Sequence, residues 1–199
     1  MKIYLSGTCA VITLGIALFI GACNSSSTSS NSTDTSASKM SSDTTTKTSK
    51  IKTEDSDHLS VLLSANYDEV KILQLALTKT IPGDLKTTVQ KMLSDHQSAI
   101  NSLKTLASQK NITVSDSSDE QGVNKYDGLN KENGKSFEKD FLEWLIATHK
   151  DAIAKCQDYS KNALDHDVAS WCTATLPTLQ SHLQMAEAAQ SKLSPMNSK

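Results

Sequence analysis

The amino-acid sequence predicts an all-α fold, a four-helix bundle in which two antiparallel hairpins are joined by a long crossover. Three observations support this prediction. Apolar residues recur at spacings of three and four through residues 57–195, and no segment alternates with a period of two. Pro82-Gly83-Asp84 is a turn signal between two such stretches. A polar segment, 111–136, then separates them from a second pair of stretches.

The first hairpin is expected to consist of the two helices on either side of this turn. The inward face of its first helix carries Leu59, Leu62, Asn66, Glu69, Leu73 and Ala76. The inward face of its second helix carries Leu85, Val89, Leu93, His96, Ile100, Leu103 and Ala107. Helices joined by a short turn lie antiparallel, so these two faces are expected to pack against each other.

The crossover, residues 111–136, is rich in glycine, asparagine, aspartate and lysine, and one short helix is expected within it at 123–130. It is far longer than an ordinary helix–helix connection, and long enough to run back along the bundle. Two hairpins connected in this way describe the ferritin-like version of a four-helix bundle. An up-down-up-down bundle would need only a short connection.

The second hairpin is expected to begin near Phe137. The inward face of its first helix carries Phe141, Leu142, Leu145, His149, Ala152, Cys156 and Tyr159. Asp165-His166-Asp167 breaks the pattern, and Asp167 is the expected N-cap of the next helix. The inward face of this last helix, 168–193, carries Cys172, Thr175, Leu179, His182 or Leu183, Ala186 and Leu193. Pro177 within it predicts a kink.

The N-terminal 22 residues are typical of a bacterial secretion signal. Lys2 is followed by an uncharged apolar segment that several glycine, serine and threonine residues interrupt, which favours a signal peptide over a membrane span. Ile20-Gly21-Ala22-Cys23 resembles the bacterial lipoprotein box, in which the cysteine is lipidated and becomes the mature N-terminus. The alternative is an ordinary secretory signal followed by a chance cysteine. Because Asn24 is not an aspartate, we expect an outer-membrane lipoprotein that faces the periplasm.

A disordered tether is expected at residues 23–56. Of residues 24–50, 18 are Ser or Thr and only two are apolar, so this segment cannot bury enough surface to offset its ordering entropy. The chain therefore divides into a signal peptide at 1–22, a tether at 23–56 and a folded domain at 57–195.

The charge pattern excludes nucleic acid as a partner. The 199 residues include 20 basic residues, all of them lysine, and 22 acidic residues, for a formal net charge of −2. Arginine is the side chain best suited to bidentate contacts with phosphate and guanine, and it is absent. A chain this close to neutrality offers no electrostatic footprint for nucleic acid. The expected partner is the membrane, through the lipid on Cys23.

Cys156 and Cys172 are expected to lie close together across the second hairpin. They fall about nine residues before and about six residues after the turn, and residues equidistant from a turn lie level in an antiparallel hairpin. An oxidising envelope would allow a disulfide between them. Two buried free thiols are the alternative.

Each predicted helix contributes one ionisable residue to its inward face: Glu69, His96, His149 and His182. The helical rise of about 1.5 Å per residue places all four near the middle of the bundle, within roughly one turn of one another. Three imidazoles and a carboxylate predict a site for a divalent ion such as zinc, copper or iron. A structural polar network is the alternative. His58 and His166 fall at helix ends and are expected to be solvated.

Signatures of catalysis are absent from the sequence. It has no glycine-rich phosphate loop, no G-x-S-x-G, no H-E-x-x-H and no EF-hand loop. It also lacks the Glu-x-x-His pairs of di-iron carboxylate bundles. The sequence therefore favours a binding protein over an enzyme and indicates no catalytic residue.

Three stretches resemble the signatures of a known family: Met92 to His96, Thr148 to Ile153 and Thr175 to Leu183. The family is the bacterial envelope domain of unknown function numbered four-one-four-two. The resemblance covers about residues 57–190 and implies a ferritin-like four-helix fold, an envelope location and a shared set of polar positions, but no activity. The family usually has an acidic residue where Thr148 stands, and it tends to carry core aromatics at Cys156 and Cys172.

Two functions remain open on the sequence alone. One is a lipid-anchored envelope protein that binds a divalent metal or a small ligand in the core of the bundle. The other is a structural or interaction lipoprotein without a metal site, whose surface binds another envelope component. The distances among the Glu69 carboxylate and the three imidazoles distinguish between them.

Overall fold

The computed structural model describes residues 42–193, except for the side chains of 42–52 and 55. All regular structure in this part of the chain is helical, which confirms the all-α prediction: α1 (Ser42–Thr78), α2 (Gly83–Gln109), α3 (Glu120–Asn130), α4 (Gly134–Asn162) and α5 (His166–Leu193). The predicted signal peptide and Cys23 lie outside the described residues. None of these five helices is long and apolar enough to cross a membrane.

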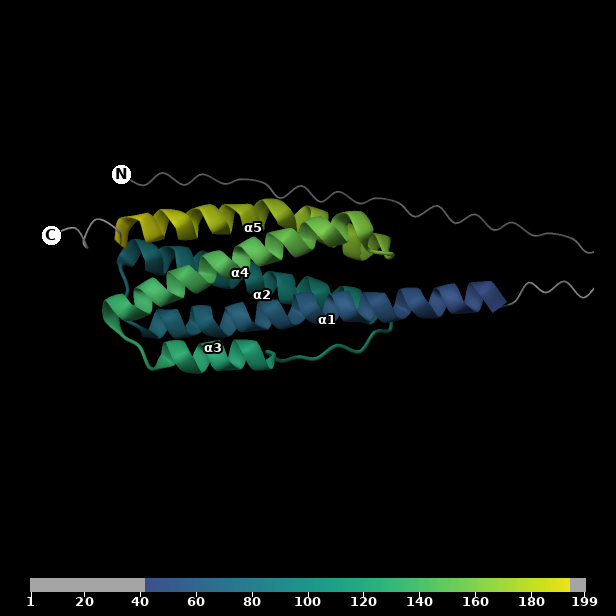
Figure 1. Cartoon of the computed structure of the whole chain (residues 1–199), viewed down its shortest axis with the longest axis horizontal. Helices are drawn as coiled ribbons and strands as arrows, with labels where there is room; N and C mark the ends of the chain where they lie inside the picture. The colour runs from purple at the N-terminus through teal and green to yellow at the C-terminus, as the bar shows by residue number, and fades with distance from the viewer. Residues whose placement is uncertain (1–41, 194–199) are drawn as a thin grey trace, which may run out of the picture. The chain divides into compact units, whose positions relative to one another are not determined.

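The four long helices form two hairpins within a helical bundle. α1 packs along α2, and α4 packs along α5 (Figure 1). Contacts between the hairpins are sparser and involve chiefly α5 with α1 and α2. The ferritin-like topology stays a prediction.

α1 begins at Ser42, inside the segment that was expected to be a tether. Residues 42–56 contain neither glycine nor proline. Once a helix is nucleated and packed, each added residue gains one backbone hydrogen bond, so extension costs little. The first helix therefore begins at Ser42, within the segment predicted as the tether at 23–56.

The crossover contains α3, close to the short helix that was expected at 123–130. The Asp119 carboxylate caps α3 by accepting a hydrogen bond from the backbone N–H of Gly122 at 2.9 Å. α3 lies along the outer side of α1 (Figure 1). The contact is close, because a Cβ atom added to Gly122 would lie 1.9 Å from Oδ1 of Asp68 on α1.

Lys79, directly after α1, forms hydrogen bonds with the end of the crossover. Its Nζ donates hydrogen bonds to the carbonyl oxygens of Asn130 and Glu132, each at 2.8 Å. The same ammonium group lies 5.6 Å from the centre of the Phe137 ring, near the start of α4. The turn between α1 and α2 therefore holds the N-terminal end of the second hairpin in place.

The N-cap of α5 is Asp165 rather than the predicted Asp167. Oδ1 of Asp165 accepts hydrogen bonds from the backbone N–H groups of Asp167 and Val168, at 2.8 and 3.1 Å. Both aspartates also form ion pairs with Lys110 after α2, at 2.5 and 2.9 Å. The predicted break between the last two helices was correct, but helical periodicity does not show which of two aspartates, separated by one residue, is the N-cap.

The core consists of two apolar clusters with a layer of polar residues between them. We call Glu69, His96, His149 and His182 the polar layer. One cluster surrounds Phe137 and Phe141, and the other contains Leu59, Leu103 and Cys172. On every long helix, residues of one cluster precede the polar residue and residues of the other follow it. At the position left open between His182 and Leu183, His182 is the buried residue.

The two remaining histidines differ in environment. His166 is exposed, as expected. His58 is half-buried and stacks on Tyr159 with ring centroids 4.0 Å apart, so the expectation that it is solvated was wrong. His58 lies inside α1, which begins at Ser42, and not at a helix end, and Tyr159 of α4 packs against it.

Cys156 and Cys172 are both buried, and their thiols lie in hydrogen-bond contact. The predicted proximity is therefore correct, but both cysteines are free thiols and the predicted disulfide is not formed in this structure. The Cys172 thiol donates to Cys156, which lowers the pKa of Cys156. Hairpin geometry brings the sulfur atoms together, whereas the bond also requires an oxidant.

The close approach of α3 to α1 predicts that Gly122→Ala and Gly128→Ala have opposite effects. Nothing lies within 4 Å of a Cβ atom added to Gly128, so that change gains roughly 0.5–1 kcal/mol from helix propensity. Gly122→Ala forces Asp68 to move and loses roughly 1–3 kcal/mol by overpacking. Urea unfolding of the two variants measures the difference, and equal stabilisation by both would contradict the described α1–α3 contact.

The cysteine geometry predicts that oxidation joins Cys156 and Cys172 within one chain. A disulfide that closes a loop of this length stabilises by roughly 3 kcal/mol in the chain-entropy model. Mass spectrometry of the domain oxidised with glutathione disulfide should find a peptide pair linked through these residues, and its unfolding midpoint should exceed that of the reduced domain. Recovery of two free thiols after oxidation would show that the sulfur atoms do not meet.

Candidate metal centre

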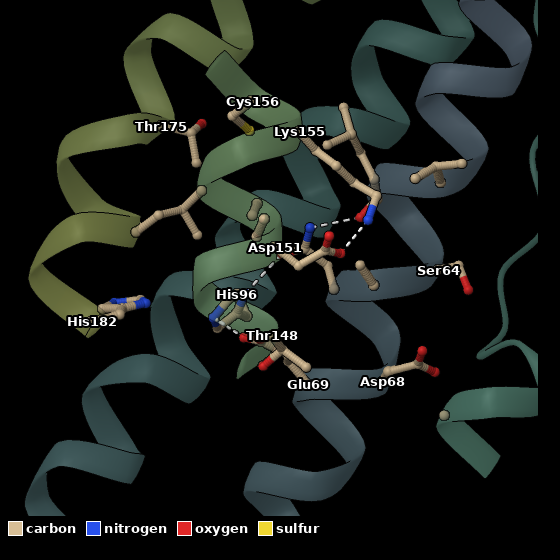
Figure 2. A pocket seen from close by; sticks show the side chains of 18 of the residues that line it. Ser64, Asp68, Glu69, His96, Thr148, Asp151, Lys155, Cys156, Thr175 and His182 are labelled. Carbon is tan, nitrogen blue, oxygen red and sulfur yellow. Dashed lines mark hydrogen bonds and ion pairs between the residues drawn. The ribbon is translucent and has the colours of Figure 1, made fainter. Parts of the chain in front are cut away.

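The structure brings together the three histidines that the sequence predicted for the metal site, and Glu69 contacts two of them, His96 and His149. Glu69 comes from α1, His96 from α2, His149 from α4 and His182 from α5, and their exposed fractions are 5%, 5%, 0% and 1%. One nitrogen from each imidazole lies within 4.8 Å of those of the other two. Figure 2 shows Glu69, His96 and His182 reaching the same pocket, with Thr148 beside Glu69. The heights inferred from helical rise were therefore correct.

His96 is oriented by Asn66, one turn before Glu69 on α1. The Asn66 side-chain amide donates to the carbonyl oxygen of Leu62 at 2.7 Å, which leaves Oδ1 of Asn66 as an acceptor. Nδ1 of His96 lies 2.9 Å from this oxygen and therefore donates its proton to it. Nε2 of His96 is then the nitrogen that faces the polar layer.

His149 and His182 are oriented in the same manner. Nδ1 of His149 donates to the carbonyl oxygen of Leu145 at 2.8 Å, and Nε2 of His182 donates to the Asp95 carboxylate at 2.8 Å. The other ring nitrogens, Nε2 of His149 and Nδ1 of His182, are buried and have no hydrogen-bond partner among the described residues. Each is the nitrogen that carries a lone pair in the neutral ring.

Glu69 and His96 form a buried ion pair with 2.5 Å between Oε2 and Nε2. Burial alone would raise the pKa of Glu69, but the charges of His96 and His149 and hydrogen bonds from His96 and Thr148 lower it to about 2. Burial likewise opposes the charge on His96, and Glu69 outweighs it and raises the pKa of His96. The proton on His96 therefore compensates the buried carboxylate.

The pKa of His182 shifts in the opposite direction to that of His96. Burial and, to a lesser extent, the charges of His96 and His149 lower its pKa to about 4, although Asp95 opposes them. His182 is consequently neutral at physiological pH, with its lone pair on Nδ1. Asp95 itself is partly exposed and also pairs with Lys91 at 2.8 Å, so this outer partner connects the polar layer to the surface.

These donors fit a transition metal ion. Three nitrogens within 4.8 Å of one another share a point no more than about 2.8 Å from each, against roughly 2.0–2.1 Å for a zinc–imidazole bond. Small ring rotations would close the difference. An imidazole that donates its outer N–H to an oxygen while its other nitrogen faces a common point is the arrangement found at metal-bound histidines. Glu69 offers a carboxylate oxygen as a further ligand.

Sequence reasoning missed the outer partners of this centre. Asn66 had been assigned to the inward face of α1, and a polar residue on that face one turn before Glu69 was a signal for it. Asp95 adjoins His96 in the sequence, yet it contacts His182 on another helix, and no spacing rule predicts that. Thr148 adjoins His149 and faces Glu69, where it donates a hydrogen bond instead of adding negative charge.

A large cavity borders the polar layer on one side. Its volume is about 1230 Å³, and side chains from all five helices line it, among them Glu69, His96 and His182. We call this cavity the chamber. Figure 2 shows part of its lining, including Cys156 and Thr175 at a distance from the histidines. An ion held in the polar layer would therefore not be sealed from small molecules.

Comparison with known families agrees with the resemblance seen in the sequence. The family model for a domain of unknown function (DUF4142) matches residues 39–189, which contain the whole polar layer and all but the last turn of α5. Comparison with curated proteins and with solved structures finds no match. Because the match covers well over half of the sequence, the chain belongs to the DUF4142 family.

Proposed function

We propose that this protein binds a divalent transition metal ion, such as zinc, copper or iron, between His96, His149, His182 and Glu69 in the core of its helical bundle. The observation that supports this most is the common orientation of the three imidazoles. Each donates one ring N–H to an oxygen acceptor, and one nitrogen of each ring lies within 4.8 Å of those of the other two.

In a purely structural polar network, the unpaired imidazole nitrogens would reduce the stability of the folded state. A buried donor or acceptor without a partner costs roughly 1–3 kcal/mol, and natural cores rarely contain such groups. Here two buried nitrogens, on His149 and His182, are unpaired among the described residues. A metal ion would bind both lone pairs at once, which a proton cannot do.

The donor set also indicates which ions are favoured. Three imidazoles and one carboxylate suit borderline ions, whereas magnesium and calcium prefer sites made of oxygen atoms. A divalent ion would replace the proton of His96 as the positive charge beside Glu69. The buried carboxylate thus has a counter-ion in either state.

We further propose that the bundle has the ferritin-like topology and is attached to the envelope through lipid on Cys23, as an outer-membrane lipoprotein. The long crossover between two hairpins supports the first inference. The sequence Ile20-Gly21-Ala22-Cys23 and the Ser/Thr-rich segment after it support the second. Because the sequence carries none of the catalytic motifs considered above, we propose a binding function rather than an enzyme.

Metal binding is tested by calorimetric titration of the chelator-treated domain with zinc and copper. We expect about one ion per chain and an unfolding temperature that rises with metal concentration, because a ligand that binds only the folded state stabilises it. Loss of an outer partner, which only orients a metal ligand, typically weakens a metal site by about 10–100-fold. His149→Ala and His182→Ala remove the ligands themselves and should therefore weaken metal binding at least that much.

His58→Ala and His166→Ala provide matched controls, since both histidines lie outside the polar layer. They should bind metal as the unaltered domain does. Circular dichroism of each metal-free variant checks that it is folded. A folded, unaltered domain that takes up neither zinc nor copper would refute the metal proposal and would favour the alternative of an interaction lipoprotein.

Lipid attachment is tested with Cys23→Ser in a bacterial host that processes lipoproteins. The unaltered chain should incorporate labelled fatty acid and appear in the membrane fraction. The variant should lose the label, because no thiol remains at position 23 to be acylated. Equal labelling of both chains would contradict the proposed anchor.

A further inference from the structure

The two sides of the polar layer are packed differently. One helical turn from the polar residues, toward the Phe137 end, each helix places a buried apolar residue: Leu73, Met92, Leu145 and Ala186. Four positions away on the other side, the residues are Ala65, Ile100, Ile153 and Thr178, and the two isoleucines belong to or pack against the second apolar cluster. Ala65 and Thr178 line the chamber, together with Ala99 and Ala152 beside the isoleucines. The chamber therefore meets the layer at four small side chains.

Small side chains account for this open space. Four leucines at these positions would fill the gap between the hairpins, as Leu73, Met92 and Leu145 do on the other side of the layer. The resulting volume of about 1230 Å³ exceeds the roughly 300–1,000 Å³ typical of small-molecule sites. The hairpins are thus held apart directly beside Glu69, His96 and His182, where a metal ion would have its accessible face.

We infer that the chamber binds a small uncharged molecule whose nitrogen or oxygen atom completes the coordination of the metal ion held by the polar layer. This inference rests on the proposed function. Three imidazoles and one carboxylate fill four positions, so this molecule would take a fifth, which copper and iron accept and which zinc reaches only by expanding beyond tetrahedral coordination. The chamber borders Glu69, His96 and His182 and has space for it.

The lining of the chamber indicates an uncharged ligand. Apart from the histidines and Cys156, its ionisable residues are five carboxylates and two lysines, so it disfavours anions. Lys155 is already paired with Asp151, and Asp95 with Lys91. The Ser64 hydroxyl, which is buried without a hydrogen-bond partner among the described residues, can bond to a neutral polar molecule instead. The hydroxyl groups of Ser98 and Thr175 already donate to backbone carbonyl groups and remain as acceptors.

The experiment uses the copper-loaded domain at pH 8, with imidazole as the uncharged probe and azide as the anionic one. Imidazole should change the visible and electron paramagnetic resonance spectra of the copper and should bind at least tenfold more tightly than azide. Metal content measured after gel filtration shows whether the copper stays bound.

Variants that fill the chamber separate this inference from the metal proposal. Ala65→Leu with Thr178→Leu should weaken imidazole binding at least tenfold while copper is still taken up. Ala154→Leu is the matched control, because Ala154 is an exposed alanine of α4 that does not line the chamber. It should bind both copper and imidazole as the unaltered domain does.

The outcomes are distinct. A domain that takes up no copper refutes the proposed function, and this inference with it. A domain that takes up copper but shows no spectral change with imidazole, or the same change in the filled variant, overturns the inference alone. Azide binding as tight as imidazole binding would show that the ligand is not selected for being uncharged.

Discussion

The buried charge of Glu69 is the constraint that organises this bundle. An ionised carboxylate in an apolar core costs several kcal/mol unless neighbouring groups compensate it. Glu69 is almost fully buried, and yet interactions with His96, His149 and Thr148 keep its pKa near 2. These partners come from two other helices, so the carboxylate fixes the axial positions of α1, α2 and α4 relative to one another.

The same requirement explains why polar residues form a layer instead of lying scattered through the core. An isolated imidazole in either apolar cluster would have to find its own partners. Gathered at one level, the three rings are oriented by Asn66, Asp95 and the Leu145 carbonyl, which lie around the outside of the layer. The apolar clusters above and below can then consist almost entirely of aliphatic and aromatic side chains.

The all-α class, the helices and the members of the polar layer were predictable because each depends on local periodicity. The spacing of Leu73 from Glu69 or of Met92 from His96 needs no knowledge of the rest of the chain. The start of α1 was not predictable, because serine and threonine composition describes a segment alone and not the helix that it extends. Asp95 and the chamber depend on how far apart two hairpins lie, and no pattern within one helix contains that distance.

The separation of the chain into two hairpins has a consequence for the order of folding. Most contacts of α1 are with α2, and most contacts of α4 are with α5. These pairings join segments that are near each other in the sequence, so they form quickly. The contacts that assemble Glu69 with His149, and Asp95 with His182, span about half the domain and carry the larger loop-closure entropy. Docking of preformed hairpins, with the ionisable groups leaving water at that moment, would then be the late step that limits the folding rate.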